Sequence, residues 1–277
     1  MGSVITLTTD FGTEDAYVAV MKGVILGINP WAGMVDICHT IEPQNISQAA
    51  FVISTAYEYF SHGTIHMVVV DPGVGGRRRA VILKTPGAFF VAPDNGILSY
   101  IISALKEEIP SSQESPSGAE FEELPPGLQA VNITNPEFWH HPVSSTFHGR
   151  DIFAPVSAYL SLGVPMEEFG DGINTVLTLP VPYPRTGEGG ELVGHIIHID
   201  RFGNLITDIK KEDLPSDKPS LEITGHVIES LSTSYSDGDK LRALLGSSGH
   251  LEIALRNGSA AGFLGARIGD EVIITDG

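Results

Sequence analysis

The chain has 277 residues, of which 42% are hydrophobic, and a formal net charge of -18 from 34 acidic and 16 basic side chains. This size suits one large domain or two smaller ones, and the negative charge opposes binding to the phosphate backbone of nucleic acids. The longest apolar runs, such as MVVV at 67–70, are far shorter than the roughly 20 residues that span a bilayer, so we expect no membrane partner. The N-terminus does not resemble a signal peptide, and the single cysteine, Cys38, excludes an internal disulfide. Both features favour the cytoplasm.

The first 170 residues alternate strand-like and helix-like runs, a pattern typical of an α/β layer fold with a mostly parallel sheet. The expected elements are a strand over 4–10, a helix over 15–29, a strand over 33–39, a helix over 47–60, a buried strand over 64–71 and a hairpin over 80–93 around Pro86-Gly87. The three single strands end in Asp10, His39 and Asp71. Ligands of open α/β sheets bind outside the carboxyl ends of the strands, so these residues mark one candidate binding edge.

The remainder of the chain differs from this pattern in its residue composition and periodicity. Residues 107–127 are rich in Pro, Ser, Gly and Glu and predict an exposed, weakly ordered insertion. Prolines and glycines over 181–190 predict a linker between an α/β domain (1–180) and a second domain (191–277). The second domain has short β-type runs, with helical patterning only in AAGFLG and DKLRALLG. We therefore predict a small all-β, barrel-like C-terminal domain.

Five short motifs combine polar residues with glycine or aromatic residues: TTDFG (8–12), DPGVGGRRRA (71–80), APDNG (92–96), SSTFHGRDIFAP (144–155) and RFGNLITD (201–208). Each motif alone has a plain structural interpretation, such as a strand cap, a glycine turn or a surface histidine beside a helix cap at Asp151. The glycine-rich motif precedes a strand-like run, whereas a dinucleotide site opens a helix, so a Rossmann site is disfavoured. The histidines are not spaced as a zinc-binding set, and we expect no metal.

Together, in this order and across nearly the whole chain, the five motifs resemble the S-adenosyl-L-methionine (SAM) hydroxide adenosyltransferase family, relatives of the SAM-dependent fluorinase and chlorinase. The resemblance implies hydrolysis of SAM to adenosine and L-methionine by water attacking the ribose C5′, without a cofactor. It also implies a homotrimer in which the N-terminal domain of one subunit and the C-terminal domain of the next share each site. An Asp, an Arg and a His arrange the water in that family, and the motifs place them at Asp71, Arg78 and His148.

The resemblance also implies substrate contacts. Asp10 would accept hydrogen bonds from the ribose hydroxyls, Asn204 would read an adenine edge, and Phe202 would offer a stacking face. Asp200 would pair with the methionine ammonium, and Ser247 is a further contact in SSGHLEIALRN.

Departures from the halogenating relatives support a hydrolase. Those relatives have a tyrosine in place of His148 and a tryptophan in place of Gln44, and the fluorinase has a tyrosine in place of Asp71. A halide arrives as an anion, whereas water must lose a proton, and an arginine beside an aspartate or histidine meets that need. Either Asp71 or His148 could accept the proton. A SAM-dependent halogenase and a non-catalytic SAM or adenosine sensor remain the alternatives.

Overall fold

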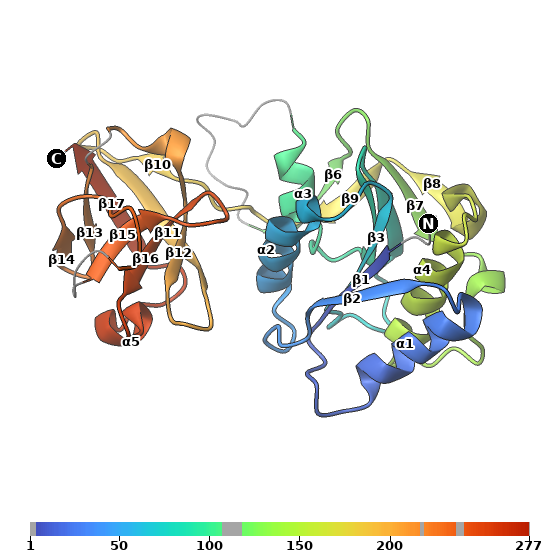
Figure 1. Cartoon of the computed structure of the whole chain (residues 1–277). Coiled ribbons are helices and arrows are strands. Elements are labelled where there is room, and N and C mark those ends of the chain that lie inside the picture. The colour runs from blue at the N-terminus through green and yellow to red at the C-terminus, as the bar shows by residue number, and fades with distance from the viewer. Residues whose placement is uncertain (1–3, 107–117, 217–218, 237–240, 277) are drawn as a thin grey trace. The chain divides into compact units, whose positions relative to one another are not determined.

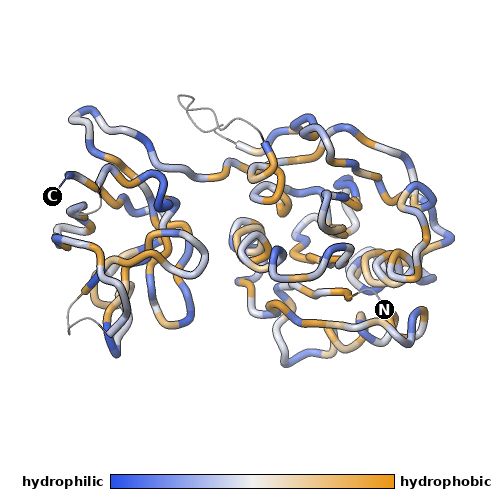
Figure 2. Tube along the Cα trace, turned by 45° about the horizontal axis from the view of Figure 1, so that its top comes forward, coloured by the Kyte–Doolittle hydropathy of each residue, from blue (hydrophilic) through white to orange (hydrophobic). Residues whose placement is uncertain are grey.

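The computed structural model describes residues 4–106, 118–216, 219–236 and 241–276. The chain divides into two compact units, unit 1 (Met1–Val181) and unit 2 (Pro182–Gly277), each with its own hydrophobic core (Figure 1). The segment expected to be a linker includes a short strand, β10 (Arg185–Thr186), which pairs with unit 2. In both units hydrophobic stretches of the chain, drawn in orange, alternate with hydrophilic stretches, drawn in blue (Figure 2).

Unit 1 is an α/β unit. Its strands are β1 (Val4–Thr9), β2 (Gly33–Cys38), β3 (Thr64–Val69), β4 (Ala80–Lys84), β5 (Ala88–Pro93), β6 (Glu120–Glu123), β7 (Gln129–Ile133), β8 (Gly170–Ile173) and β9 (Thr175–Thr178). Its helices are α1 (Tyr17–Ile28), α2 (Ile46–Ala56), α3 (Ser99–Ala104) and α4 (Ala154–Ser161), with a π-helical turn over Gly149–Phe153 and 3-10 turns over Tyr57–Tyr59, Pro136–Phe138 and Met166–Phe169.

The main sheet of unit 1 has the order β2-β1-β3-β5-β4-β7-β8. Strands β2, β1, β3 and β5 are parallel, whereas β4, β7 and β8 pair antiparallel, so the predicted mostly parallel sheet is only partly right. The reason is the hairpin around Pro86 and Gly87. A tight hairpin reverses the chain, whereas a parallel pair needs a long crossover, and the strands beyond β4 continue the antiparallel pattern.

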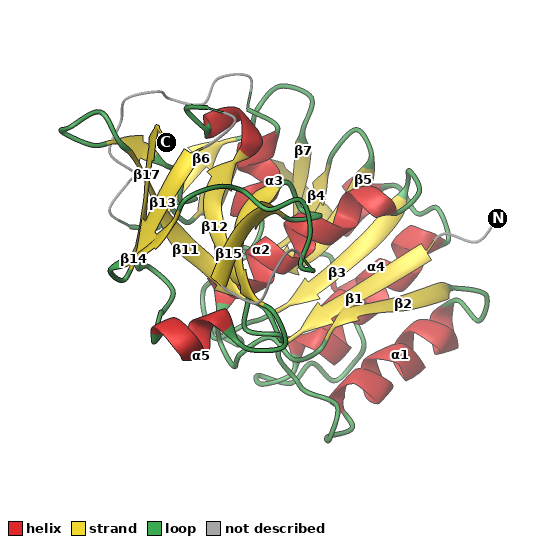
Figure 3. Cartoon of the chain, turned by 60° about the vertical axis from the view of Figure 1, so that its left-hand side comes forward, coloured by secondary structure: helices red, strands yellow, loops and turns green. Residues whose placement is uncertain are grey.

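Helices cover both faces of this sheet, α1 and α4 on one side and α2 and α3 on the other (Figure 3). Alternate strand residues point to opposite faces, so Ile5 and Leu7 of β1 pack with Met21 of α1. Val68 of β3 packs instead with Ile53 of α2 on the other face. Each such buried aliphatic side chain contributes about 1.5–3 kcal/mol relative to exposure, which holds the sheet between its helices.

The carboxyl ends of β1, β2 and β3 meet at one edge of the sheet, because these strands are neighbours and parallel. Asp10, His39 and Asp71 follow these strands, so they lie at the same edge, as the sequence predicts.

Part of the predicted insertion at 107–127 is described. Residues 107–117 lie outside the described residues. Residues 120–123 form β6, which pairs antiparallel with β9 in a two-stranded sheet, so this part of the insertion is structured.

Unit 2 is an antiparallel β unit. Its longer strands are β11 (Leu192–Ile199), β12 (Leu205–Lys210), β13 (Pro219–Ile223), β14 (His226–Ile228), β15 (Leu241–Leu245), β16 (His250–Leu255) and β17 (Glu271–Asp276), with a 3-10 turn over Lys211–Asp213 and helix α5 (Ala260–Leu264). The strand order is β14-β13-β17-β11-β12-β16-β15, and the end strands β14 and β15 also contact each other. The sheet therefore curls into the barrel-like form that the sequence predicts.

One local prediction for unit 2 is wrong. The run DKLRALLG was expected to be helical, but Leu241–Leu245 form β15, paired along its length with β16. In β15 the side chain of Ala243 is buried in the barrel core, so pairing with β16 outweighs the helical preference of these residues.

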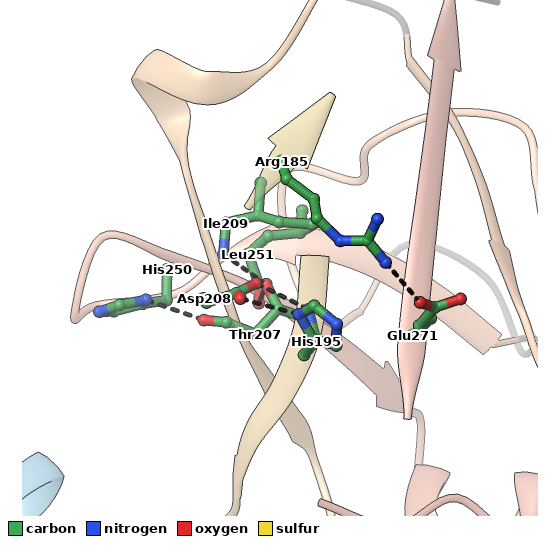
Figure 4. A network of polar contacts seen from close by, with 8 residues as sticks. All are labelled: Arg185, His195, Thr207, Asp208, Ile209, His250, Leu251 and Glu271. Atoms are coloured by element: carbon green, nitrogen blue, oxygen red, sulfur yellow. Dashed lines mark hydrogen bonds and ion pairs between the residues drawn. The ribbon is translucent and has the colours of Figure 1, made fainter. Parts of the chain in front are cut away.

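A buried carboxylate joins two parts of the barrel wall. Strand β11 changes its partner from β17 to β12 at His195, whose backbone N–H donates to Asp208 Oδ1 at 2.7 Å (Figure 4). The ring Nδ1 of His195 lies 3.3 Å from Asp208 Oδ2. A Cβ at Gly194 would lie 2.5 Å from Asp208 Oδ1, so this contact requires glycine. Burial raises the pKa of Asp208, while the His195 contacts lower it.

Candidate functional site

Asp71 and Arg78 form a bidentate ion pair at the edge of the sheet of unit 1. Arg78 Nε donates to Asp71 Oδ1 at 2.9 Å, and Arg78 Nη2 donates to Asp71 Oδ2. The same Nη2 donates to His148 Nδ1 at 2.9 Å. The side chains of Asp71 and Arg78 are only 6% and 12% exposed, and the guanidinium carbon lies 5.2 Å from the centroid of the Phe153 ring. The structure thus brings the three predicted catalytic residues into one cluster, called the Asp71 cluster below.

Glycines allow the loop after β3 to reach His148. Gly75 has a φ of 72°, a conformation that side chains with a Cβ rarely adopt. A Cβ added there would lie 2.3 Å from the carbonyl oxygen of Ser145. The DPGVGG sequence therefore serves close packing between the Asp71 loop and the segment that carries His148.

A buried aspartate holds the segment that carries His148. The Asp151 side chain is 0% exposed, and its Oδ2 accepts from the Ser144 N–H at 2.7 Å. Arg150 Nε donates to Asp151 Oδ1 at 2.5 Å. In the plain interpretation of this motif Asp151 caps a helix, but in the structure it ties the two ends of the 144–151 segment together. The π-helical turn begins directly after His148, and such turns occur often at functional sites.

The contact with Arg78 decides which ring nitrogen of His148 carries the proton. A guanidinium only donates, so Nδ1 of His148 accepts and the proton of the neutral ring is on Nε2. Burial lowers the pKa of His148, and the charge of Arg78 lowers it further, whereas Asp71 and Asp151 act in the opposite direction. The ring is therefore neutral near pH 7.

Asp10 lies at the same sheet edge, after β1. Its Oδ2 accepts from the Gln44 N–H at 2.8 Å, and Gln44 has a left-handed backbone with a φ of 67°. The neighbouring Phe11 packs edge-on against Phe147, with ring centroids 5.7 Å apart. The Asp10 loop thus packs against the segment that carries His148.

In unit 2 a tight turn between β11 and β12 holds three of the predicted substrate residues. Asp200 Oδ1 accepts from the N–H groups of Phe202 at 2.9 Å and Asn204 at 2.8 Å, and Oδ2 accepts from Asn204 Nδ2 at 2.9 Å. Gly203 has a φ of 82°, and a Cβ there would lie 2.1 Å from Ser259 Oγ. The turn leaves the Phe202 ring 79% exposed.

These three residues line a pocket of about 750 Å³ within unit 2. Its lining also includes residues that the sequence did not single out, namely Tyr235, Ser236, Leu255, Arg256, Asn257 and Gly258. Tyr235 Oη donates to Glu252 Oε2 at 2.5 Å, and burial together with this carboxylate raises the pKa of Tyr235. The volume and the mixture of aromatic and polar groups suit a small planar ligand.

Comparison with known proteins agrees with this arrangement. The family model for the SAM hydroxide adenosyltransferase N-terminal domain matches residues 5–170, and the model for the C-terminal domain matches residues 194–273. The chain belongs to the SAM hydroxide adenosyltransferase family.

Relatives of this family member include hydrolases and fluorinases. An (R)-S-adenosyl-L-methionine hydrolase from Salinispora tropica is 32% identical over 291 residues, covering 99% of this chain and 98% of that protein. A fluorinase from an Actinoplanes species is 27% identical over 237 residues, covering 76% and 73%. The crystal structure of an uncharacterized conserved protein from Thermotoga maritima superposes with a TM-score of 0.84 at 33% identity, covering 98% of this chain and 100% of that one.

One of the five motifs of this family member has a structural role. In APDNG, Asp94 pairs with Arg79 and accepts from the Leu177 N–H at 2.8 Å. Asn95 Nδ2 donates to the Val70 carbonyl oxygen at 2.9 Å. This motif therefore supports the chain just before Asp71.

Ser247 is the one predicted site residue of unit 2 that is absent from the pocket lining. It lies exposed in the turn between β15 and β16. The turn with Ser247 leads into His250, which pairs with Lys210 at the C-terminal end of β12. Asn204 precedes Leu205, which pairs with Ile253 at the N-terminal end of β12. Within unit 2, the structure does not bring Ser247 together with the pocket.

The missed pocket residues had a weak signal in the sequence. Arg256 and Asn257 directly follow the strand-like run HLEIAL, in the way that Asp71 follows β3. Tyr235 stands in a serine-rich segment that carries no strand or helix pattern, so its place in a pocket depends on the fold.

The described part of the chain has neither a membrane-spanning helix nor a metal-binding cluster of side chains. None of its helices is both long and apolar enough to cross a bilayer. No group of three or more His, Cys, Asp or Glu side chains in the described ranges is arranged to hold a metal ion. That the protein needs no metal or cofactor stays a prediction.

Proposed function

We propose that the protein hydrolyses SAM to adenosine and L-methionine. The observation that carries this proposal is the Asp71 cluster, in which a largely buried arginine at the sheet edge contacts both an aspartate and a histidine. The Salinispora tropica relative bears the name of this activity and matches nearly the whole chain.

The cluster suits the activation of water for an in-line displacement. The oxygen of water bonds to the ribose C5′ as the C5′–S bond breaks, and the electron pair of that bond stays on sulfur. Methionine leaves as a neutral thioether, so the leaving group needs no acid. The remaining requirements are to hold the water, to stabilise its developing hydroxide character and to take its proton.

Asp71 is the acceptor of that proton in this mechanism. His148 uses its only free lone pair, on Nδ1, to accept from Arg78, so it cannot take the proton while that contact is kept. Each carboxylate oxygen of Asp71 has a lone pair beyond the one that Arg78 occupies. The charge of Arg78 then stabilises the developing hydroxide, contributing ~10²–10⁴ in rate, and His148 orients the guanidinium.

The remaining predicted residues bind substrate in this proposal. The carboxylate of Asp10 accepts from the ribose hydroxyls, and the Phe202 ring and Asn204 amide hold the adenine in the pocket of unit 2. Asp200 meets the methionine ammonium, and Ser247 is assigned a substrate contact by the family resemblance alone.

A complete site needs the Asp71 cluster of unit 1 and the pocket of unit 2. We propose a cytoplasmic homotrimer in which neighbouring subunits contribute the two parts. A closed ring needs only one head-to-tail interface, repeated around the axis, which places the same two surfaces together at every site. The single cysteine fits a reducing compartment.

The test is product analysis in ¹⁸O-labelled water. The proposal expects adenosine with the label at its 5′-oxygen, in equal amount to unlabelled methionine. The Arg78→Ala variant should form little product, while Arg77→Ala, which removes an exposed arginine from the same loop, should behave as the wild type. Folded wild-type protein that binds SAM without forming adenosine would favour the sensor alternative. Formation of 5′-halo-adenosine on addition of chloride or bromide would favour a halogenase.

A further inference from the structure

Strand β1 carries two buried pairs of a threonine and a histidine. Thr6 Oγ1 lies 2.8 Å from His66 Nδ1, and Thr9 Oγ1 lies 2.9 Å from His39 Nδ1. Thr6, Thr9 and His66 are 0% exposed, and His39 is 7% exposed. The two pairs are chemically alike, but only the second directly precedes Asp10.

His39 holds the chain on both sides of Asp10. Before Asp10, its ring contacts Thr9 Oγ1, which also accepts from the Phe11 N–H at 3.3 Å. After Asp10, the backbone oxygen of His39 accepts from the Gly12 N–H at 2.7 Å. The backbone that carries the Asp10 carboxylate is therefore fixed to one residue of the neighbouring strand end.

His39 is itself anchored by charged residues. Its Nε2 lies 3.0 Å from Asp36 Oδ1, and Asp36 Oδ2 accepts from Lys22 Nζ at 2.6 Å. Burial acts to raise the pKa of Asp36, but the contacts with Lys22 and His39 outweigh it and lower that pKa. The charge of the ionised carboxylate attracts a proton to the nearby Nε2 of His39 without an aligned hydrogen bond, so Nδ1 is left to accept the hydroxyl hydrogen of Thr9.

The carboxylate of Asp10 is fixed by the same segment. Its Oδ2 accepts from the N–H of Gln44, five positions beyond His39. The next residue, Asn45, caps α2 by accepting from the Gln48 N–H at 2.9 Å, which anchors the end of the segment. Residues 39–45 therefore determine both the backbone and the side-chain position of Asp10.

We propose that the Thr9–His39 pair is a positioning device that sets the affinity of the site for the ribose of the substrate. The inference rests on the proposed function, in which Asp10 binds the ribose hydroxyls. A carboxylate recognises a vicinal diol through two short hydrogen bonds, so a small displacement of its backbone weakens both. The pair acts through Asp10 and does not touch the reacting atoms.

The experiment compares Thr9→Val with Thr6→Val. Both substitutions remove a hydroxyl from β1 and leave a buried histidine Nδ1 without its partner, so similar losses of thermal stability are expected. Thr9→Val should raise the KM for SAM and the Kd for adenosine about tenfold, with kcat within about threefold of wild type. Thr6→Val should change none of these three constants. Thr9→Ser, which keeps the hydroxyl, should restore wild-type affinity.

Binding of 2′-deoxyadenosine makes the test specific to the ribose. The wild type and Thr6→Val should prefer adenosine over 2′-deoxyadenosine, and Thr9→Val should lose most of that preference. Equal effects of Thr9→Val and Thr6→Val on KM, or a Thr9→Val variant that keeps the preference, would overturn the inference.

Amide hydrogen exchange separates this inference from the proposed function. Thr9→Val should speed exchange at Gly12 and Gln44 more than Thr6→Val does, with or without ligand. If the wild type neither binds adenosine nor hydrolyses SAM, the proposed function fails, and this exchange difference alone decides whether His39 positions Asp10. If the wild type hydrolyses SAM but the exchange difference is absent, the positioning inference fails and the function stands.

Discussion

The Asp71 cluster of unit 1 and the pocket of unit 2 differ in how far their side chains are buried and bonded within the protein. In the cluster, Asp71 and Arg78 are almost wholly buried and bond to each other, and Arg78 also bonds to His148. In the pocket, Phe202 is 79% exposed and Tyr235 is 49% exposed. The first region is organised before any ligand arrives, whereas the second leaves apolar surface to be covered.

This difference separates two tasks. Charges that stabilise a transition state are most effective when their positions are fixed in advance, because no reorganisation is then needed as the reaction proceeds. Binding of a flat base gains from burying exposed aromatic area on contact. We therefore expect changes in the cluster to alter the rate, and changes in the pocket to alter affinity.

The largest expected effect comes from breaking the cluster. Arg78→Ala should lower kcat by about 10³-fold, with KM within a few-fold of wild type, because the guanidinium acts on the water and not on the nucleoside. Steady-state kinetics with SAM, with Arg77→Ala as the matched control, measures this. A variant that loses SAM binding but keeps the turnover of the bound complex would contradict the division between the two regions.

The second prediction combines the two regions. Arg78→Ala and Asn204→Ala should each be nearly inactive at low SAM concentration, the first through rate and the second through affinity. After subunit exchange, an equal mixture should regain about a quarter of wild-type activity, since that fraction of shared sites pairs an intact cluster with an intact pocket. Exchange is verified by mass spectrometry of differently labelled subunits. A mixture that stays inactive after exchange, or an active monomer in light scattering, would contradict shared sites.

The third prediction separates acid unfolding from acid inactivation. Burial lowers the pKa of His66 from 6.5 to about 4, so between these values the unfolded chain binds a proton that the folded chain does not. This contribution to stability is present above pH 6.5 and is lost as the pH falls to about 4, by ~3 kcal/mol in total. His66→Phe should flatten the pH dependence of the free energy of unfolding in this range, as measured by urea titration.

His148 provides the contrast to His66. Its pKa is also lowered, so the ring stays neutral somewhat below pH 6.5 and the acid limb of kcat should lie there. His66→Phe should leave that limb unchanged. A shift of the limb in His66→Phe would mean that the loss of activity in acid reports on unfolding and not on the cluster.

The smallest effect is expected from a change at Asp208, which belongs neither to the Asp71 cluster nor to the lining of the pocket. Asp208→Asn keeps an acceptor for the His195 N–H and removes a buried charge, so the free energy of unfolding at pH 7 should change by less than about 1 kcal/mol. The pKa of Asp208 is raised in the folded protein, so its ionisation lowers the free energy of unfolding as the pH rises through that pKa. The variant has no ionisable group at this position, so this loss is absent. Urea titration at several pH values and SAM kinetics measure both properties. A changed kcat would show that the barrel wall takes part in catalysis.

The sequence alone determined the elements that carry the Asp71 cluster. The strands β1, β2 and β3 are short runs dominated by aliphatic residues and threonine, and an acidic residue or histidine follows each within two positions, so Asp10, His39 and Asp71 could be assigned to strand ends. The family resemblance then indicated Arg78 and His148. The same reasoning overestimated the parallel part of the sheet, because the predicted hairpin over 80–93 reverses the chain and the pairing of β7 and β8 beyond it leaves no local pattern.

Only the tertiary structure decided which groups meet. The chain has three consecutive arginines after Asp71, and nothing local distinguishes them. In the fold, Arg78 bonds to Asp71, Arg79 pairs with Asp94, and Arg77 is exposed. The ring nitrogen of His148 that accepts, the pocket that includes Tyr235 and Arg256, and the pairing of Thr9 with His39 likewise depend on segments distant in sequence. Hydrogen bonds and ion pairs depend on distance and direction in space, and a local sequence pattern determines neither between segments that only the fold brings together.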